Sequence, residues 1–193
     1  MAASNSKMSL EATAPKQNAE PRPIEVQAGF SSYQKVVVAL LAFLQFTVIL
    51  DFMILAPLGA ILMPALGIST SEFGLVVSAY AFSAGLAGIL SAGFADRFDR
   101  KRMLLFFYAG FLLGTLMCAV ANSFEALLLA RIVTGLFGGV LGSVVFAITT
   151  DLFPFSMRGR VMGILQTAFS ASQILGIPLG IYAANTVGWH SPF

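Results

Sequence analysis

Residues 73–121 read FGLVVSAYAFSAGLAGILSAGFADRFDRKRMLLFFYAGFLLGTLMCAVA, two apolar runs joined by one short charged segment. The runs, Phe73–Phe94 and Met103–Ala121, each have about the 20 residues that an α-helix needs to cross the hydrocarbon core of a bilayer. A buried helix of a soluble protein would account for one such run, but the pattern recurs along the chain. We therefore expect a helical hairpin that spans a membrane twice.

Three further apolar runs flank this hairpin: Val36–Leu58, which extends toward Ala65 past two prolines, Ala126–Thr150 and Val161–Ala184. Backbone N–H and C=O groups inside hydrocarbon must pair within their own segment, which favours helices. The sequence predicts an all-α integral membrane protein with five complete transmembrane helices, at about residues 36–58, 73–94, 103–121, 126–150 and 161–184. Residues 186–193 are expected to form an external loop and the start of a sixth helix, so that the transmembrane domain, 33–193, is incomplete at its C-terminal end.

The composition supports a membrane protein, because 58% of the 193 residues are hydrophobic and only 10% are charged. Soluble domains carry about a quarter charged residues. The basic residues lie in short gaps between the apolar runs and not along a polar face, which argues against a nucleic-acid partner. Cys118 lies inside an apolar run and is predicted to be a packing residue. The sequence contains no phosphate-binding Gly-Lys loop, His/Cys metal cluster or partnered nucleophile, so we predict neither an enzyme, a metal site nor a cofactor.

The basic residues alternate between the gaps. Lys and Arg occur in the polar tail, residues 1–32, and in the gaps after the second and fourth runs, whereas the gaps 66–72 and 122–125 contain none. By the positive-inside rule the N-terminus is cytoplasmic, and the protein is expected in the cell (inner) membrane. The tail has few apolar residues and is predicted to be disordered. No apolar stretch precedes Val36, so no signal peptide is expected.

The charged segment between the second and third runs, AGFADRFDRKR at residues 92–102, has an Asp-Arg-x-x-Arg-Lys-Arg order that a generic basic loop does not explain. This order resembles the signature loop of the major facilitator superfamily, G-x-L-A-D-R-x-G-R-K/R-x. The matching charged residues are Asp96, Arg97, Arg100 and Lys101. The resemblance implies that they form a charge network that steadies one conformational state. Ala92 and Asp99 replace two glycines of the pattern, and Asp tolerates the turn conformations that Gly favours.

The fourth run contains an arginine, Arg131, within a sequence that resembles the family pattern L-x-x-x-R-x-x-Q-G-x-G-A-A, with Thr134 in place of Gln and Phe137 in place of the next Gly. An arginine inside hydrocarbon needs a partner or a water-filled cavity. Asp51 is the only acid of the first run and lies at a similar depth. We expect the two residues to face a shared cavity and to couple proton movement to substrate movement, because burial favours a neutral carboxyl group and a nearby cation favours a charged one. The alternative is a static ion pair that locks the first and fourth helices.

The fifth run carries Gly176, Pro178 and Gly180, which resemble the Gly- and Pro-rich motif of efflux antiporters of this superfamily, although Ile177 interrupts the usual Gly-Pro order. Gly and Pro within a membrane helix predict a bend. The alternative is a simple kink that has no relation to antiport. Polar residues that are candidates for lining a cavity are Gln45, Tyr80, Gln166 and Gln173. His190, beside Trp189, is expected at the external interface.

The resemblance covers about residues 35–193 and implies the N-terminal helical half of a major-facilitator fold, in which two six-helix halves alternately expose a site at the midplane. It implies proton-coupled efflux of small organic molecules, drugs or sugars, by an antiporter of the drug:proton or arabinose-efflux type. Five helices are too few for this cycle, so we expect a truncated part whose partners are the lipid bilayer, protons, a small-molecule substrate and the missing C-terminal half. The alternative is a truncated membrane protein that does not transport and acts only by binding a partner.

Overall fold

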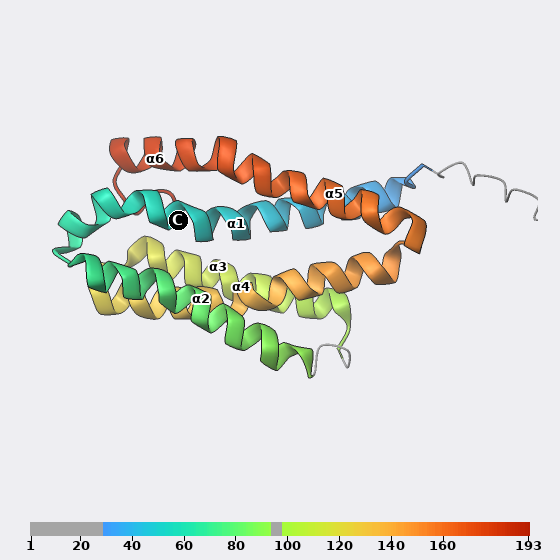
Figure 1. The fold of residues 1–193 in the computed structure, drawn as a ribbon, viewed down its shortest axis with the longest axis horizontal. Helices are drawn as coiled ribbons and strands as arrows, with labels where there is room; N and C mark the ends of the chain where they lie inside the picture. Colours follow the sequence, from blue (N-terminus) through green and yellow to red (C-terminus); the bar gives the residue numbers. More distant parts are fainter. Residues whose placement is uncertain (1–28, 94–97) are drawn as a thin grey trace, which may run out of the picture.

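The computed structural model describes residues 29–93 and 98–193, and these ranges are helical apart from short connections (Figure 1). The elements are α1 (Ser32–Leu66), α2 (Thr70–Ala92), α3 (Arg100–Val120), α4 (Phe124–Leu152), α5 (Phe155–Ala171), a π-helical turn η2 (Ser172–Gly176) and α6 (Ile177–Thr186). The last three form one helical stretch, Phe155–Thr186. Five helices of the described chain are thus long and apolar enough to cross a membrane, which confirms the predicted fold class. The predicted tail falls mostly on residues 1–28, outside the described residues.

The helices α1 to α5 each begin before the apolar run that predicts them. A polar N-cap residue precedes each of α1 to α4, whereas α5 follows Pro154, which provides no side-chain cap. At the start of α1, the hydroxyl of Ser31 accepts a hydrogen bond from the Gln34 N–H (3.2 Å), and the Gln34 side chain accepts one from the Ser31 N–H (3.0 Å). Ser69 and Glu72 form the same capping box at the start of α2. Such reciprocal caps satisfy N–H groups that the first helical turn leaves unpaired. Hydropathy detects apolar runs and therefore misses the polar residues that cap the helices.

The expected start of a sixth helix is not seen in residues 187–193, which form turns. Gly188 has a φ of 123°, which ends the helical path, and Trp189 folds back into a buried apolar cluster with Leu55, Cys118 and Leu127. His190 stacks on Trp189, and its Nε2 atom lies 2.9 Å from the Ala121 carbonyl oxygen. The terminal segment therefore closes one end of the bundle. Cys118 is fully buried in this cluster, as predicted for a packing residue.

The helices pack in two groups (Figure 1). In the first, α4 packs against α2 and α3; in the second, α1 packs against α5, η2 and α6. Contacts between α1 and the first group are sparser. The chain order thus differs from the packing order, because α1 leaves its sequence neighbour α2 to lie against the last helical stretch.

Glycines of α4 allow α2 to approach closely, and Gly139 is the clearest case. A Cβ atom at this position would lie 2.5 Å from the Cα atom and 2.7 Å from the carbonyl carbon of Ala84, and neither backbone atom can rotate away. We expect Gly139→Ala to separate α2 from α4 and to lower stability by about 1–3 kcal/mol, as overpacking does. The midpoint of thermal unfolding in detergent measures this loss. Gly142→Ala is the matched control, since its added Cβ meets nothing within 4 Å; an equal loss in both variants would contradict the close-packing explanation.

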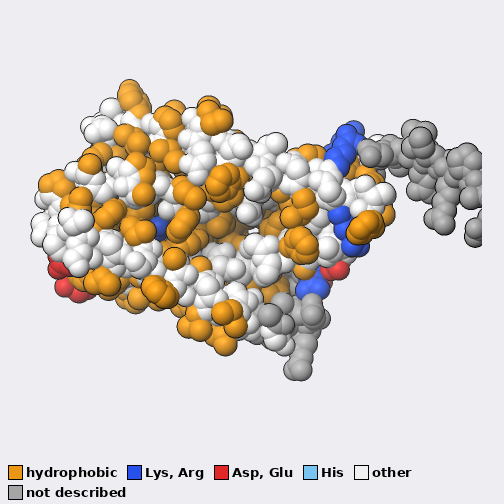
Figure 2. Space-filling model, in the orientation of Figure 1, with side chains coloured by type: hydrophobic (Ala, Val, Ile, Leu, Met, Phe, Trp, Pro, Cys, Tyr) orange, Lys and Arg blue, Asp and Glu red, His pale blue; other side chains and the backbone are white. Residues whose placement is uncertain are grey.

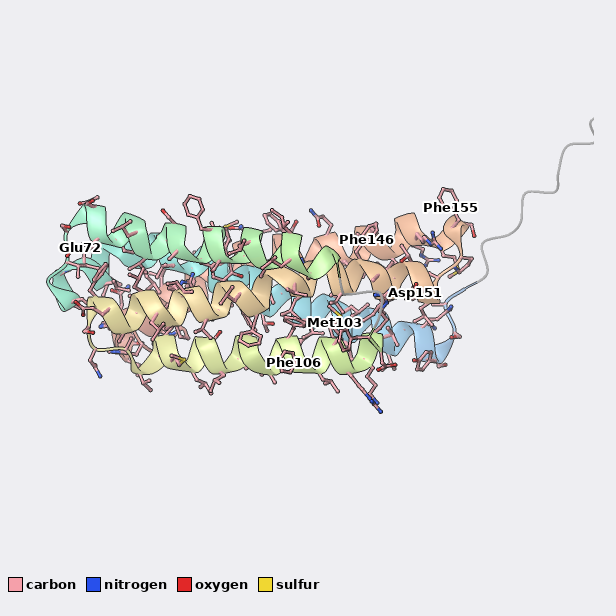
Figure 3. All side chains as sticks on the ribbon, turned by 90° about the horizontal axis from the view of Figure 1, so that it is seen from below. Glu72, Met103, Phe106, Phe146, Asp151 and Phe155 are labelled. Carbon is pink, nitrogen blue, oxygen red and sulfur yellow. The ribbon has the colours of Figure 1, made fainter. Side chains whose placement is uncertain are left out.

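Charged side chains gather at the two ends of the bundle (Figures 2 and 3). Lys and Arg side chains cluster where α1, α3 and α5 begin, and we call this the basic end; its described members are Lys35, Arg100, Lys101, Arg102, Arg158 and Arg160. Glu72 lies at the opposite end from Asp151 (Figure 3). Between the ends, large apolar side chains such as Phe82 and Ile89 are exposed. A flank of this kind suits lipid and not water.

Candidate functional site

Asp51 of α1 and Arg131 of α4 form an ion pair inside the bundle. The Nη1 atom of Arg131 donates to Oδ2 of Asp51 at 2.8 Å, and its Nη2 atom donates to the Asp51 backbone carbonyl at 3.2 Å. The two side chains are only 1% and 5% exposed. Burying a charge costs several kcal/mol unless a partner compensates it. The structure thus brings together the two charged residues that the sequence places inside hydrocarbon.

Side chains from α2 and α3 complete the surroundings of this pair. Thr115 of α3 donates to the other carboxylate oxygen of Asp51, Oδ1, at 3.3 Å. The ring of Tyr80, from α2, lies against the guanidinium group of Arg131, with 4.9 Å between Cζ and the ring centroid. Such a cation–π contact stabilises a desolvated cation. Tyr80 also packs against Phe52, with ring centroids 5.1 Å apart. Helices α1 to α4 therefore all meet at this point.

Thr115 and Phe52 are not among the residues that sequence analysis selects. Phe52 is one of eighteen phenylalanines, so its residue type singles out no position. Thr115 is a hydroxyl-bearing residue within the apolar run 103–121, which is the one signal that marks it. A hydroxyl inside a membrane helix commonly bonds to its own backbone, so the residue type alone does not indicate a contact with Asp51.

One donor of the pair is unused. The Nε atom of Arg131 is buried and has no hydrogen-bond partner among the described residues. Buried polar atoms are nearly always paired in protein interiors. A spare donor beside a carboxylate allows the carboxylate to change its hydrogen bonds without losing the cation. The hydrogen bonds of the pair thus involve both terminal nitrogens of the guanidinium group but not Nε.

The pair lies at the boundary between the two groups of helices. Asp51 belongs to α1, and its neighbours Leu50 and Ile54 lie against glycines of the last helical stretch. Terminal methyl groups of Leu50 and Ile54 come within 2.6 Å of the positions that a Cβ atom would take at Gly176 and Gly180, respectively. The predicted Gly- and Pro-rich motif therefore contacts α1 on both sides of Asp51.

The helical path next to this contact is irregular. The π-helical turn η2 ends at Gly176, and Pro178 follows in the first turn of α6. Pro lacks the N–H group that would continue the regular hydrogen-bond ladder. π-Helical turns are rare and occur often at functional sites. The glycines and the proline that predict a bend thus coincide with a local change of helix type.

At the basic end, Arg100 connects the start of α3 with the end of α4. Its Nε atom lies 3.0 Å from Oδ2 of Asp151. Their side chains are 28% and 55% exposed, and exposed pairs of this kind contribute at most about 1 kcal/mol. Lys101 is exposed beside this pair. Asp96 and Arg97, the other predicted members of the charge network, lie outside the described residues.

Residues 41–193 match the family model of the Major Facilitator Superfamily. This chain belongs to the major facilitator superfamily. Members of the superfamily are transporters and not enzymes, in agreement with the sequence prediction.

Curated relatives of this chain include several transporters of the superfamily. It is 34% identical over 143 residues to an uncharacterized MFS-type transporter of Bacillus subtilis, YceJ, with 74% of this chain and 36% of the relative covered. It is 34% identical over 126 residues to multidrug resistance protein 3 of the same organism, covering 65% and 24%. A probable sugar efflux transporter of Helicobacter pylori is 29% identical over 124 residues, covering 64% and 32%. The chain thus spans between 24% and 36% of the lengths of these relatives.

A solved structure agrees with the fold. The crystal structure of a bacterial homolog to the human lysosomal transporter Spinster, inward-facing and unoccupied, matches with a TM-score of 0.69 at 21% identity, covering 83% of this chain and 36% of that one. At this identity the likeness supports the superfamily fold of the helices.

The structure explains how this chain departs from the superfamily's loop pattern at Asp99. Asp99 has a φ of −60°, and its side chain accepts a hydrogen bond from the Arg102 N–H at 2.9 Å. It is the N-cap of α3, so it does not adopt a glycine-like turn conformation. The explanation from turn tolerance was therefore wrong. Asp is among the preferred N-cap residues, and a cap typically contributes about 1 kcal/mol.

The structure also accommodates the two residues of α4 that differ from the superfamily pattern, Thr134 and Phe137. Thr134, which stands where the superfamily has Gln, turns its hydroxyl to the Ala130 carbonyl at 2.7 Å. Phe137, which stands where it has Gly, lies against Gly110 of α3 and packs with Phe106 and Phe107. A glycine on the facing helix thus provides the room that Phe137 needs.

The four polar residues predicted to line a cavity differ in their exposure and in their contact with the ion pair. Tyr80 is 6% exposed and packs against the ion pair. Gln45 and Gln173 are half-buried, and Gln166 is exposed. In the described ranges, none of these three amides has a hydrogen bond to another residue. Only Tyr80 therefore belongs to the site around Asp51.

Proposed function

We propose that this chain is part of a secondary transporter that exchanges protons for small organic molecules in the direction of efflux. Membership of the superfamily supports transport. Efflux and the substrate class, drugs or sugars, are supported by relatives named as a multidrug resistance protein and a probable sugar efflux transporter. The chain spans a third or less of these two relatives, so the complete cycle is assigned to it together with a second helical half.

The buried pair of Asp51 and Arg131 carries the proposal of proton coupling. An ionisable pair inside a membrane protein is costly and marks a functional site by default. With Asp51 charged, its attraction to Arg131 holds α1 to α4 across the boundary between the helix groups. Binding of a proton to Asp51 removes this attraction and allows the groups to move relative to each other. Proton binding is thereby linked to a rearrangement within this helical half, which is coupled in turn to the movement of the two halves that exposes a site on alternate sides.

We assign the basic end to the cytoplasmic side of the cell (inner) membrane by the positive-inside rule. The described residues of this end carry six basic side chains, and the opposite end carries Glu72 and Glu125. In this orientation the pair of Arg100 and Asp151 lies at the cytoplasmic face. We assign it, with Asp96, Arg97 and Lys101, to a charge network that steadies one state of the cycle.

The test is proton-linked movement of a probe by the protein expressed from its complete reading frame. The purified protein is reconstituted in liposomes with an acidic interior, and a pH-sensitive dye reports the gradient. Addition of ethidium or L-arabinose should discharge the gradient faster than in protein-free liposomes. Movement of a probe without discharge would overturn proton coupling. Movement of neither probe would favour the second candidate, a membrane protein that binds a partner without transporting.

A further inference from the structure

The hydroxyl group of Thr115 lies within hydrogen-bond distance of two acceptors. These are Oδ1 of Asp51, at 3.3 Å, and the backbone carbonyl of Phe111, at 3.1 Å. A hydroxyl has one proton to donate and two lone pairs that accept. The Phe111 carbonyl is also the acceptor for the helical N–H four residues later, so it stays paired when the hydroxyl turns away. Thr115 can therefore change partner without leaving a buried polar group unsatisfied.

The two carboxylate oxygens of Asp51 have different surroundings. Oδ2 accepts the short, charge-assisted hydrogen bond from Arg131 at 2.8 Å, whereas the contact recorded for Oδ1 is the longer one from Thr115. Charge-assisted hydrogen bonds are about twice as strong as neutral ones. A proton that binds Asp51 while Arg131 stays in place therefore binds Oδ1. Thr115 is the neighbour of the oxygen that changes its protonation state.

We propose that Thr115 is a positioning residue whose hydrogen bond switches with the protonation of Asp51. This inference rests on the proposed function, in which Asp51 binds and releases a proton. With Asp51 charged, the hydroxyl donates to Oδ1. When a proton from water binds Oδ1, the new O–H donates to Oγ of Thr115, and the hydroxyl proton turns to the Phe111 carbonyl. One O–H bond forms on Asp51, no other covalent bond changes, and Arg131 keeps its charge.

Other titratable groups near Asp51 do not take this role. From α4, Arg131 can only donate, and from α2, Tyr80 faces the guanidinium with its ring. From α3, Cys118 is buried in the apolar cluster that contains Leu55 and Leu127. The titratable side chains described on the last helical stretch are Arg158, Arg160 and Tyr182. The two arginines lie at the basic end, and Tyr182 is exposed. Among the described side chains, Thr115 is the one recorded at Oδ1 that can both donate and accept.

The first test compares Thr115→Val, which removes the hydroxyl, with Thr115→Ser, which keeps it. Loss of the donor disfavours the charged carboxylate, so proton release needs a more alkaline medium. The profile of exchange rate against pH should shift to higher pH in Thr115→Val. The variant loses a stronger hydrogen bond to the charged carboxylate and a weaker one to the protonated carboxyl group, and the difference, about 1 kcal/mol, corresponds to a shift of about half a unit to one unit. It should stay in place in Thr115→Ser. Thr149→Val is the control, a buried threonine whose hydroxyl donates to the Val145 carbonyl at 2.9 Å, and it should leave the profile unchanged.

The second test does not require transport. Infrared difference spectra between acidic and alkaline pH show the carbonyl band of protonated Asp51, which is identified by its loss in Asp51→Asn. We expect this band to titrate at higher pH in Thr115→Val and as in the native protein in Thr115→Ser. If the native protein exchanges no protons yet the band responds in this way, the proposed function fails and the role of Thr115 stands. An unshifted band in Thr115→Val would overturn the inference, as would equal shifts in both variants, because these would reflect packing and not the hydroxyl.

Discussion

Asp51→Asn should reduce proton-linked export of ethidium or L-arabinose to the background of protein-free liposomes. An asparagine keeps the size of the side chain, and its amide oxygen can still accept from Arg131, but it neither binds nor releases a proton. The variant therefore loses the group that senses protons at the boundary between the two groups of helices. Discharge of a pH gradient by the added probe is the measurement.

Two controls separate a loss of coupling from a loss of folding. Exchange of labelled for unlabelled probe needs no net proton movement and should persist in Asp51→Asn. Asp51→Glu keeps a carboxyl group and should retain proton-linked export at a reduced rate. Intact coupling in Asp51→Asn would contradict the proposal and would favour a static ion pair that only joins α1 to α4.

Arg131→Met should cause the largest loss of stability of any single substitution in the site. Methionine fills much of the space but leaves the Asp51 carboxylate without its cation in the interior. Removing one partner of a buried pair typically costs about 3–5 kcal/mol, because the remaining charge is uncompensated. The Thr115 hydroxyl, 3.3 Å from Oδ1, carries no charge and does not replace the arginine. A lower midpoint of thermal unfolding in detergent is the expected result.

The double variant Asp51→Leu/Arg131→Met should recover most of this loss. Replacing both ions by apolar residues of similar size is often neutral or stabilising, so the charge and not the packing explains the single variant. Proton-linked export should be absent from both variants. Equal destabilisation of the single and double variants would show that packing of the arginine, and not its charge, stabilises this region.

The helices could be predicted because transfer into lipid is decided residue by residue. Each apolar run is long enough to span the hydrocarbon core wherever it packs. Its formation of a transmembrane helix therefore does not depend on the rest of the chain. The limits of the helices depend on caps such as Ser31 and Asp99, which are polar and lie outside the runs. These caps could be found from local sequence, but hydropathy does not detect them. The turn at Gly188 and the burial of Trp189 depend on partners from α1, α3 and α4.

The two charged members of the site could also be predicted, because a charge inside hydrocarbon is costly in any arrangement and so demands a partner. Their uncharged neighbours could not. Whether Thr115 and Phe52 face the ion pair depends on the rotation of α3 and α1 about their axes. A membrane helix that is apolar on all sides carries no stripe that reveals this rotation. Close approaches between distant residues decide it, such as that of Gly139 to Ala84.

The sequence by itself predicted the five membrane-spanning helices found in the described part of this chain, the resemblance to the major facilitators, and Asp51 and Arg131 as the two charges within the apolar runs. Only the tertiary structure decided that α1 packs with α5 and α6, that α4 packs with α2 and α3, and that the ion pair lies between these groups. The reason is physical. Moving an apolar side chain from lipid to a helix–helix contact brings little hydrophobic free energy, because lipid tails are equally apolar. The arrangement of membrane helices therefore depends on how well the facing surfaces fit. That fit involves residues far apart in the chain.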